Sequence, residues 1–433
     1  MAKLLTLLIL ALLLGACSAP PAAPTATVLP ANAILVDASR SLGAISPWVL
    51  GSNHGPWTFL NPQVQPLAAA AGLGYLRFPG GNWGDLNDIE TWQLDQFVAL
   101  ARQLGAEPAV SVRLRGGSPE QAAALVRYAN VDKGYAIRYW SIGNEPSLYK
   151  DYDTARFNRE WRAVALAMAA VDDQIVFVGP DTHQFTADLA SNPKDATGAD
   201  WLTSFLQANG DLVGIVAVHR YPFPKGGDQR ALPSAAELLA SSEEYDRLIP
   251  ALKQLVLTTT GRELPVAVTE INSNWANVSG GEATPETFYN ALWWADALGR
   301  LIRQQTTIVA QFCLTTLPGS GEIGLLARDA PRLIYYVYPL YARLGEEQIY
   351  AETRAPQVLA VAARRADGAL TLILVNRSPH DVSAPLVLAG HPATAAAATW
   401  RLDRQHNSTQ IADTPLDAPL LLPAESVTLL IIP

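Results

Sequence analysis

Two glutamates could together perform acid–base and nucleophilic chemistry. Glu145 follows the apolar segment 137–143, and Glu270 follows the apolar, β-branched segment 264–269. Short segments of this kind predict buried β-strands. If both strands belong to one parallel barrel, their carboxyl ends bring the two side chains to the same face. Two facing carboxylates suit the cleavage of a glycosidic bond, because one protonates the leaving oxygen while the other attacks or stabilises the anomeric carbon.

The distance between the two carboxyl groups decides the stereochemical outcome. A separation of about 5–5.5 Å gives double displacement with retention, whereas about 6.5–9.5 Å leaves room for water and gives inversion. The sequence alone leaves this distance open. In both cases one carboxyl must stay protonated near neutral pH while its neighbour is ionised, which requires two different surroundings.

Eight strand-like segments alternate with helical patterns between residues 47 and 345 and predict a (β/α)8 TIM barrel. An open, doubly wound parallel sheet is the alternative, and it usually carries a glycine-rich phosphate loop after its first strand. Here the first strand is followed by Asn53-His54-Gly55 without a GxGxxG motif, which favours the barrel. The predicted strands are 48–53, 74–78, 107–114, 137–143, 174–179, 212–219, 264–269 and 307–314.

The pattern changes after the barrel, where helical spacing ends and short strands follow one another. Residues 346–433 therefore predict a small C-terminal all-β domain, similar to a β-sandwich. An isolated strand, Ile34–Asp37, precedes the barrel within residues 33–46, and we expect it to join this domain. The strands expected in the domain are 358–363, 370–375, 384–388, 399–402 and 426–432.

The N-terminus predicts a secreted protein with a lipid anchor. In residues 1–16, Lys3 precedes a short apolar run, which is too short to cross a bilayer core of about 30 Å and is typical of a signal peptide. Leu14-Gly15-Ala16-Cys17 resembles the lipobox of bacterial lipoproteins, which implies lipidation of Cys17. The Pro/Ala-rich residues 17–32 suit an extended tether. We expect an extracytoplasmic protein, lipid-anchored to the bacterial cell membrane.

The composition excludes several classes of protein. The net charge of −9 argues against a nucleic-acid partner, which calls for a basic face. Two cysteines cannot form a disulfide framework or a cysteine-rich zinc site, and the six histidines show no HExxH spacing. We expect no metal and no cofactor, and the oligomeric state stays open.

The motifs at the ends of the fourth and seventh predicted strands resemble those of a known group of enzymes. Asn144-Glu145-Pro146 and the distant Glu270 are similar to the paired motifs of clan A glycoside hydrolases, which are retaining barrel enzymes. The resemblance implies that Glu145 is the general acid/base and Glu270 the nucleophile. It also implies that Asn144 hydrogen-bonds the 2-hydroxyl of the sugar being cleaved.

Two further segments carry the same resemblance. Arg77-Phe78-Pro79-Gly80-Gly81 resembles a segment of the α-L-arabinofuranosidases in this clan, which implies that Arg77 holds Glu270 ionised through a charge-assisted hydrogen bond. His219-Arg220-Tyr221 resembles the His-x-Tyr of several clan families. It implies that Tyr221 donates its hydroxyl to Glu270 and that His219 lines the cleavage subsite.

The loops after the strands supply the remaining candidates for sugar contacts. His54 and Asn82 are polar groups after the first and second strands, and Trp83 and Trp275 offer flat rings for stacking on sugars. One feature departs from the clan, because many members carry a tryptophan at the end of strand eight. Residues 313–316, Cys-Leu-Thr-Thr, occupy that place here.

These observations predict a retaining O-glycosyl hydrolase acting on an extracellular polysaccharide or oligosaccharide. The motifs resemble arabinofuranosidases, β-xylosidases, β-glucuronidases and endoglucanases in different places, so the sugar, the linkage and the choice of endo or exo action stay open. One alternative is a catalytically silent carbohydrate-binding lipoprotein on a hydrolase scaffold. Another is a transglycosidase, which uses the same residues with a sugar as acceptor.

Overall fold

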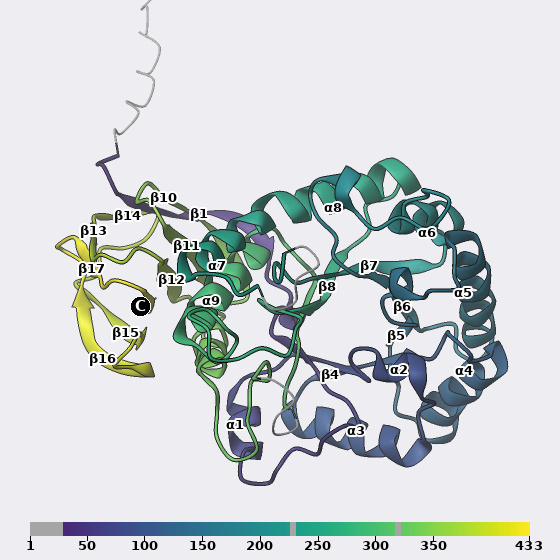
Figure 1. Cartoon of the computed structure of the whole chain (residues 1–433). Coiled ribbons are helices and arrows are strands. Elements are labelled where there is room, and N and C mark those ends of the chain that lie inside the picture. Colours follow the sequence, from purple (N-terminus) through teal and green to yellow (C-terminus); the bar gives the residue numbers. More distant parts are fainter. Residues whose placement is uncertain (1–28, 226–230, 317–321) are drawn as a thin grey trace, which may run out of the picture.

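The computed structural model describes residues 29–225, 231–316 and 322–433 (Figure 1). A closed barrel of parallel strands carries helices around it, and a β-rich C-terminal region lies to one side. The expected signal peptide, Cys17 and most of the expected tether lie outside the described residues. Within the described ranges, none of the helices has the length and apolar character needed to cross a membrane.

The barrel closes because its first strand, β2, pairs with its last, β9, through Gly51 and Ala310. All neighbouring strands run parallel, as strand–helix alternation requires. The predicted TIM barrel is therefore confirmed, and the open sheet is excluded. Its strands are β2 (Gly51–Asn53), β3 (Tyr75–Phe78), β4 (Glu107–Val112), β5 (Tyr139–Ile142), β6 (Val176–Thr182), β7 (Val213–Arg220), β8 (Val266–Ile271) and β9 (Ile308–Gln311).

Local capping sets where several barrel helices begin and end. Ser118 accepts a hydrogen bond from the amide of Gln121 at 3.2 Å and Pro119 opens α4, while α3 ends at Gly105 with φ +71°. The helices are α1 (Gln65–Ala70), α2 (Trp83–Leu86), α3 (Thr91–Leu104), α4 (Pro119–Val126), α5 (Thr154–Ala169), α6 (Trp201–Asn209), α7 (Ala235–Ser241), α8 (Tyr245–Thr260), α9 (Phe288–Arg303) and α10 (Val337–Tyr341).

The interior of the barrel is filled with side chains. A buried cluster takes residues from β3 to β9, among them Tyr75, Tyr139, Ile215 and Ile308. A filled barrel leaves no passage along its axis, so functional groups must lie at the ends of the strands.

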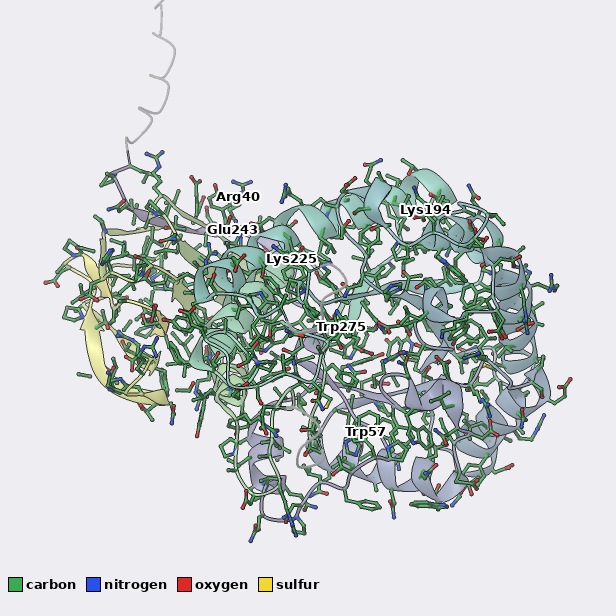
Figure 2. All side chains as sticks on the ribbon, in the orientation of Figure 1. Arg40, Trp57, Lys194, Lys225, Glu243 and Trp275 are labelled. Carbon is green, nitrogen blue, oxygen red and sulfur yellow. The ribbon has the colours of Figure 1, made fainter. Side chains whose placement is uncertain are left out.

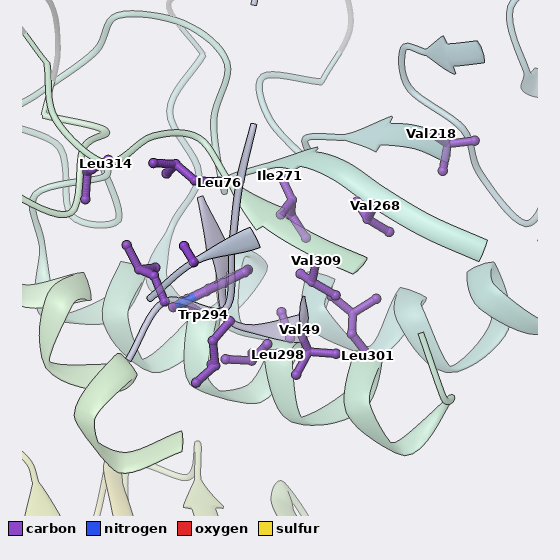
Figure 3. Packing of buried hydrophobic residues seen from close by; sticks show 14 of the residues in the cluster. Val49, Leu76, Val218, Val268, Ile271, Trp294, Leu298, Leu301, Val309 and Leu314 are labelled. Atoms are coloured by element: carbon purple, nitrogen blue, oxygen red, sulfur yellow. The ribbon is translucent and has the colours of Figure 1, made fainter. Parts of the chain in front are cut away.

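Helix α9 is buried on all sides because it lies between the barrel and the C-terminal region. Trp294, Leu298 and Leu301 pack with barrel residues such as Val268 and Val309 (Figure 3). The opposite side of α9 contacts strands β11 (Val358–Arg364) and β12 (Leu370–Asn376). The buried charges of α9 are paired, since Arg300 donates a hydrogen bond to Asp296 at 2.6 Å.

The C-terminal region consists of one large sheet and one small one. The eight-stranded sheet has the order β14-β1-β10-β11-β12-β18-β15-β16, and a two-stranded sheet pairs β13 with β17. Leu420 and Leu422 of the small sheet share an apolar cluster with the large one. The other strands are β1 (Ile34–Ala44), β10 (Glu347–Thr353), β13 (Val382–Ala384), β14 (Leu386–Ala389), β15 (Ala396–Leu402), β16 (Asn407–Pro415), β17 (Leu420–Leu422) and β18 (Ser426–Ile432).

Strand β1 precedes the barrel in sequence but belongs to the C-terminal sheet. It pairs antiparallel with β10 and parallel with β14. Strand β16, which the sequence did not indicate, lies at the edge of the sheet and is largely exposed. Its polar residues therefore lack the alternation that marks a half-buried strand.

Candidate active site

The two glutamates predicted to do the chemistry lie side by side at the carboxyl ends of the barrel strands. Glu145 follows β5, and Glu270 is the fifth residue of β8. Their carboxylate oxygens come within 4.8 Å of each other. A separation this short matches the close carboxylate pair of retaining rather than inverting enzymes.

The backbone around Glu145 is unusual and positions its side chain. Gly143 has φ +77° and Glu145 has φ +45°, so the chain turns through two left-handed residues directly after β5. The amide of Glu145 donates a hydrogen bond to the carbonyl of Asp181 at 3.1 Å. Left-handed backbone at a non-glycine residue costs free energy, and such residues occur often in active sites.

The ring of His219 lies close to both carboxylates. Its Nδ1 lies 3.0 Å from Glu145 Oε1 and 3.6 Å from Glu270 Oε2, and its Nε2 lies 3.7 Å from Asp181 Oδ1. The ring is fully buried. This corrects the expectation that His219 lines the cleavage subsite, because the ring lies beneath the acids rather than on the wall that a sugar would touch.

Arg77 is almost completely buried and ties several strand ends together. Its guanidinium donates hydrogen bonds to Asn53 at 3.0 Å, Asn144 at 2.9 Å and Asp181 at 3.2 Å. Its distance to Glu270 Oε2 is 3.5 Å, so it acts on Glu270 as an ion-pair partner. The expected short hydrogen bond from Arg77 to Glu270 is therefore absent between these described residues, because the guanidinium is held by its other acceptors.

The hydroxyl of Tyr221 donates a hydrogen bond to Glu270 Oε1 at 2.7 Å, as the resemblance implied. Asn144 is buried, and both the oxygen and the nitrogen of its side-chain amide form hydrogen bonds. Its Oδ1 accepts from Arg77, while its Nδ2 donates to Asn82 Oδ1 at 3.0 Å. A contact between Asn144 and a sugar hydroxyl would replace the bond to Asn82, which lies exposed at the cavity wall.

The two carboxyls have different surroundings, as catalysis requires, but in the opposite sense to the expected roles. Burial acts to raise the pKa of Glu145, yet the hydrogen bond and charge of His219 outweigh it and leave that pKa below its ordinary value. Burial raises the pKa of Glu270; the charge of His219 opposes this, and the neighbouring Glu145 carboxylate adds to it. The surroundings therefore shift the pKa of Glu145 downwards and the pKa of Glu270 upwards.

Charge in the cluster balances when one of the two glutamates keeps a proton. Arg77 is cationic, and although burial opposes it, the surrounding carboxylates raise the pKa of His219 to about 9. The carboxyls of Asp181, Glu145 and Glu270 face these two cations. Burial opposes ionisation of Asp181, but Arg77, His219 and Thr269 outweigh it and hold its pKa well below the usual range.

A cavity of about 950 Å³ opens above the two glutamates. Trp275, which is 41% exposed, and Lys225 line it at the mouth of the barrel (Figure 2). Phe312, at the end of β9, also lines it. β9 is the eighth strand of the barrel, so an aromatic ring does lie at the end of that strand. It comes one residue before the segment 313–316, which contains no tryptophan.

A smaller cavity of about 250 Å³ adjoins this one. Trp57 and Trp83 line it, and it shares Asn82 and Phe312 with the larger cavity. Trp83 thus lies beside the cleft rather than over the two glutamates. The aromatic walls suit the apolar faces of further sugar rings.

His54 is the predicted sugar contact that the structure places elsewhere. It is buried and lines a separate cavity on the outer side of the barrel, next to Phe78 and α3. The preceding residue, Asn53, points inward instead and bonds Arg77 and the carbonyl of Thr269. Successive strand residues face opposite sides, which explains why the two neighbours separate.

Sequence reasoning missed three polar groups of the site. Asp181 at the end of β6 contacts Arg77 and accepts from Thr269 at 2.5 Å, while His183 lines the cavity and contacts Ser147 at 2.5 Å. Asp85, on α2, accepts hydrogen bonds from the hydroxyl of Tyr149 and the amide of Asn144. Asp181 and His183 follow the fifth predicted strand, so reading every strand end for polar residues would have found them.

The described residues hold one group of three side chains that could ligate a metal ion: Glu145, His219 and Glu270. A dication there would have to compete with the nearby guanidinium of Arg77. His219 Nδ1 already hydrogen-bonds Glu145 at 3.0 Å and lies 3.6 Å from Glu270 Oε2. The arrangement therefore fits acid–base and nucleophilic work by the side chains themselves.

Sequence comparison finds relatives among plant and bacterial proteins. Heparanase-like protein 2 of Arabidopsis thaliana is 26% identical over 260 residues, which cover 58% of this chain and 45% of that protein. An intracellular exo-α-(1→5)-L-arabinofuranosidase of Halalkalibacterium halodurans is 28% identical over 183 residues, which cover 38% of this chain and 33% of that one. The chain spans less than half the length of these curated relatives. No family model matches the sequence.

Solved structures share the fold over almost the whole chain. The α-L-arabinofuranosidase of Thermotoga maritima superposes with a TM-score of 0.73 at 17% identity, covering 93% of this chain and 99% of that one. A bifunctional glucanase-xylanase from a metagenome library gives 0.72 at 19% identity, with 93% and 99% covered. A xyloglucanase of Paenibacillus polymyxa gives 0.70 at 14% identity, with 92% and 99% covered. The resemblance expected from the sequence is confirmed, and the chain has the fold of the clan A glycoside hydrolases.

Proposed function

We propose that this protein is a retaining O-glycosyl hydrolase. The observation that carries the proposal is the close pair of Glu145 and Glu270, whose carboxylate oxygens come within 4.8 Å beneath an open cavity. The named activities of the relatives and structural neighbours, which cleave glycosidic bonds, support the same chemistry.

In the first half of the reaction, the Glu270 carboxylate attacks the anomeric carbon and the bond to the leaving oxygen breaks. Glu145 transfers its proton to that oxygen, which departs as the hydroxyl of the released group. In the second half, Glu145 takes a proton from water, and the oxygen of that water displaces Glu270 from the anomeric carbon. Two inversions at the same carbon give net retention.

Neighbouring side chains stabilise the negative charge that Glu270 carries before it attacks and after it is released. Tyr221 and Arg77 both act on Glu270 and favour its ionised form. A bound substrate places the glycosidic oxygen beside Glu145 and a partly positive carbon beside Glu270, and both favour moving the shared proton to Glu145. Because the two carboxyls titrate as a pair, a bound substrate redistributes the proton between them.

The substrate we propose is a polysaccharide or oligosaccharide that contains pentose or glucose units. A cavity of about 950 Å³ with an adjoining aromatic-walled cavity has room for more than one sugar ring. The relatives and neighbours named as an arabinofuranosidase, a xyloglucanase and a glucanase-xylanase support this class.

We further propose that the protein acts outside the cytoplasm, attached to the cell membrane through lipidated Cys17. The support is the sequence of residues 1–17, with its basic start, short apolar run and lipobox-like end. Labelling of the expressed protein with a radioactive fatty acid, compared with Cys17→Ser, tests this. Equal labelling of both proteins would contradict it.

The activity is tested by release assays on the purified protein. The panel contains aryl arabinofuranoside, xyloside, glucoside, galactoside and glucuronide, together with xylan, xyloglucan, arabinan and mixed-linkage glucan. We expect turnover of at least one member, with the first-formed product retaining its anomeric configuration by proton NMR. An inverted first product would exclude the double displacement.

The nucleophile is tested with Glu270→Ala. We expect this variant to stay folded but inactive, and added azide to restore turnover by giving a glycosyl azide of inverted configuration, because azide attacks in place of the missing carboxylate. Full activity without azide would refute the assignment.

A further inference from the structure

A cavity of about 280 Å³ lies away from the cleft, between the loop after β2 and helix α3. It shares none of its described lining residues with the cavity above the two glutamates. His54, the predicted sugar contact that the site does not use, lines it. We call this the α3 cavity.

Two exposed aromatic rings line the α3 cavity. Phe59, on the loop, is 71% exposed, and Trp92, in the first turn of α3, is 50% exposed. Two large rings left open to water beside one cavity form the kind of exposed apolar surface that marks a binding site, unlike single rings scattered over a surface. Flat rings on a polar-rimmed cavity suit stacking on the apolar face of a sugar.

Amide side chains supply the polar part of the wall. Gln65, Gln93, Gln96 and Gln103 all line the cavity. Gln93 accepts from the amide of Glu90 at 2.9 Å, and Gln103 donates to Gln65 at 3.3 Å, but the side chain of Gln96 bonds none of the described residues. An amide offers both donors and an acceptor, which is what a hydroxyl group needs.

His54 adds a buried polar atom without a partner. The residue is only 7% exposed, and its Nδ1 accepts or donates no hydrogen bond among the described residues. Burial lowers the pKa of His54 to about 4, so the ring is neutral at neutral pH. A buried polar atom without a partner costs free energy, and His54 carries such an atom at the edge of this cavity.

The charge of the wall defines the class of ligand. None of the described lining residues is charged at neutral pH, so nothing there would recognise a phosphate, a sulfate or a uronate. Uncharged walls of aromatic rings and amides match an uncharged polyhydroxyl compound. The volume suits one sugar ring rather than a long oligosaccharide.

We propose that the α3 cavity is a secondary binding site for a neutral sugar unit of a polysaccharide chain. The choice of ligand rests on the proposed function, because a hydrolase that acts on a polymer gains from holding it at a second point. Binding at two linked sites raises the effective concentration of the chain at the cleft without any new contact there.

The test measures binding separately from turnover. Purified protein carrying Glu270→Ala is titrated calorimetrically with cellohexaose, xylohexaose and α-1,5-arabinohexaose. Trp92→Ala and Gln96→Ala are then added in the same background. Leu166→Ala is the matched control, because Leu166 on α5 is also 50% exposed and lines none of these cavities. Trp275→Ala weakens binding in the cleft and so isolates the second event.

We expect Trp92→Ala to weaken binding of at least one oligosaccharide at the second site by about tenfold, the effect of losing one stacked ring. Leu166→Ala should leave it unchanged. Absence of a second binding event, or affinities that neither Trp92→Ala nor Gln96→Ala alters, would overturn the proposal. If the protein with Glu270 intact shows no turnover in the release assays but Trp92-dependent binding persists, the binding site is supported and the proposed hydrolase activity is contradicted.

Discussion

Single side chains decide the chemistry of this protein through the way they share protons and charge. Glu145 and Glu270 are the same type of residue. They differ because His219 hydrogen-bonds Glu145, while Tyr221 and Arg77 act on Glu270. Their roles therefore follow from neighbours rather than from the carboxyl groups themselves. Two consequences can be measured directly.

Glu145→Ala should slow substrates according to their leaving groups. We expect a loss of about 10²–10⁴-fold for substrates with poor leaving groups, which need a proton, and a much smaller loss in bond cleavage for dinitrophenyl glycosides, which do not. Pre-steady-state release of the aryl group measures the first step alone. Equal losses for both substrates would mean that another residue is the acid.

The stability of the protein should depend on the charge of His219. The surrounding carboxylates overcome its burial and raise its pKa to about 9, above the unfolded value of 6.5. Its contribution to stability is then complete below pH 6.5 and is lost as the pH rises through 9. A shift of this size corresponds to about 3 kcal/mol in the free energy of unfolding.

Urea unfolding of the protein and of His219→Asn between pH 7 and 10 measures this effect. We expect the protein to lose stability over this range and His219→Asn to lose less of it. Asp181, Glu145 and Glu270 face the His219 ring, and Arg77 in turn pairs with Asp181 and Glu270. The control is His380→Asn, at an exposed position. Parallel pH curves for the protein and His219→Asn would contradict the prediction.

Strand ends and the turns that follow them bring these side chains together. Glu145 is positioned by the turn after β5, where Gly143 and Glu145 adopt left-handed backbone. The space beside Gly143 is also closed, since a Cβ there would lie 2.9 Å from the Tyr149 hydroxyl oxygen and 3.1 Å from the Cβ of Leu114. We therefore expect that Gly143 cannot be replaced by a residue with a side chain without cost.

Gly143→Ala should therefore reduce both activity and stability. The strained backbone and the crowded Cβ together should cost about 1–3 kcal/mol in unfolding free energy, and displacement of Glu145 should lower kcat more than it raises KM. Gly134→Ala is a matched control, because Gly134 has φ +62° with no atom within 4 Å of the added Cβ. It should show the backbone cost with unchanged kcat. Equal kcat values for both variants would contradict the role of this turn.

The barrel and the C-terminal sheets form a continuous structure through helix α9. Arg377, from the C-terminal region, reaches across to the carbonyl of Leu239 at 2.6 Å, to Glu243 at 2.6 Å and to Asp296 of α9 at 3.2 Å. Asp296 is completely buried and also accepts from Arg300 at 2.6 Å. Buried ion pairs of this kind make the two parts interdependent.

Arg377→Leu should destabilise the whole molecule. It leaves the buried Asp296 with one cationic neighbour fewer, which should cost about 2–4 kcal/mol in the free energy of unfolding. Arg365→Ala removes an exposed ion pair with Asp367 and should cost at most about 1 kcal/mol. Denaturant unfolding followed by tryptophan fluorescence compares them, and equal midpoints for the two variants would refute the interdependence.

The order of the barrel strands and the two glutamates could be read from the sequence because both signals are local. An apolar, β-branched segment indicates a strand by itself, and a polar residue at its end is placed on the catalytic face by the parallel arrangement alone. Strand β16 could not be predicted from the sequence, because an exposed edge strand lacks the alternation of apolar and polar residues. Phe312 could not be predicted to line the cavity, because this depends on how the loop after β9 faces the cavity.

The tertiary structure alone decided which polar residues touch a ligand and which support others. His219, Asn53 and Asn144 all follow or end barrel strands, yet they are buried and bind protein groups, while His54 lines another cavity. The side on which a proton rests in the glutamate pair likewise depends on distances between groups on different strands. Sequence fixes the types and the order of these residues, whereas burial and electrostatic coupling arise only when distant segments meet, since both depend on separations in space.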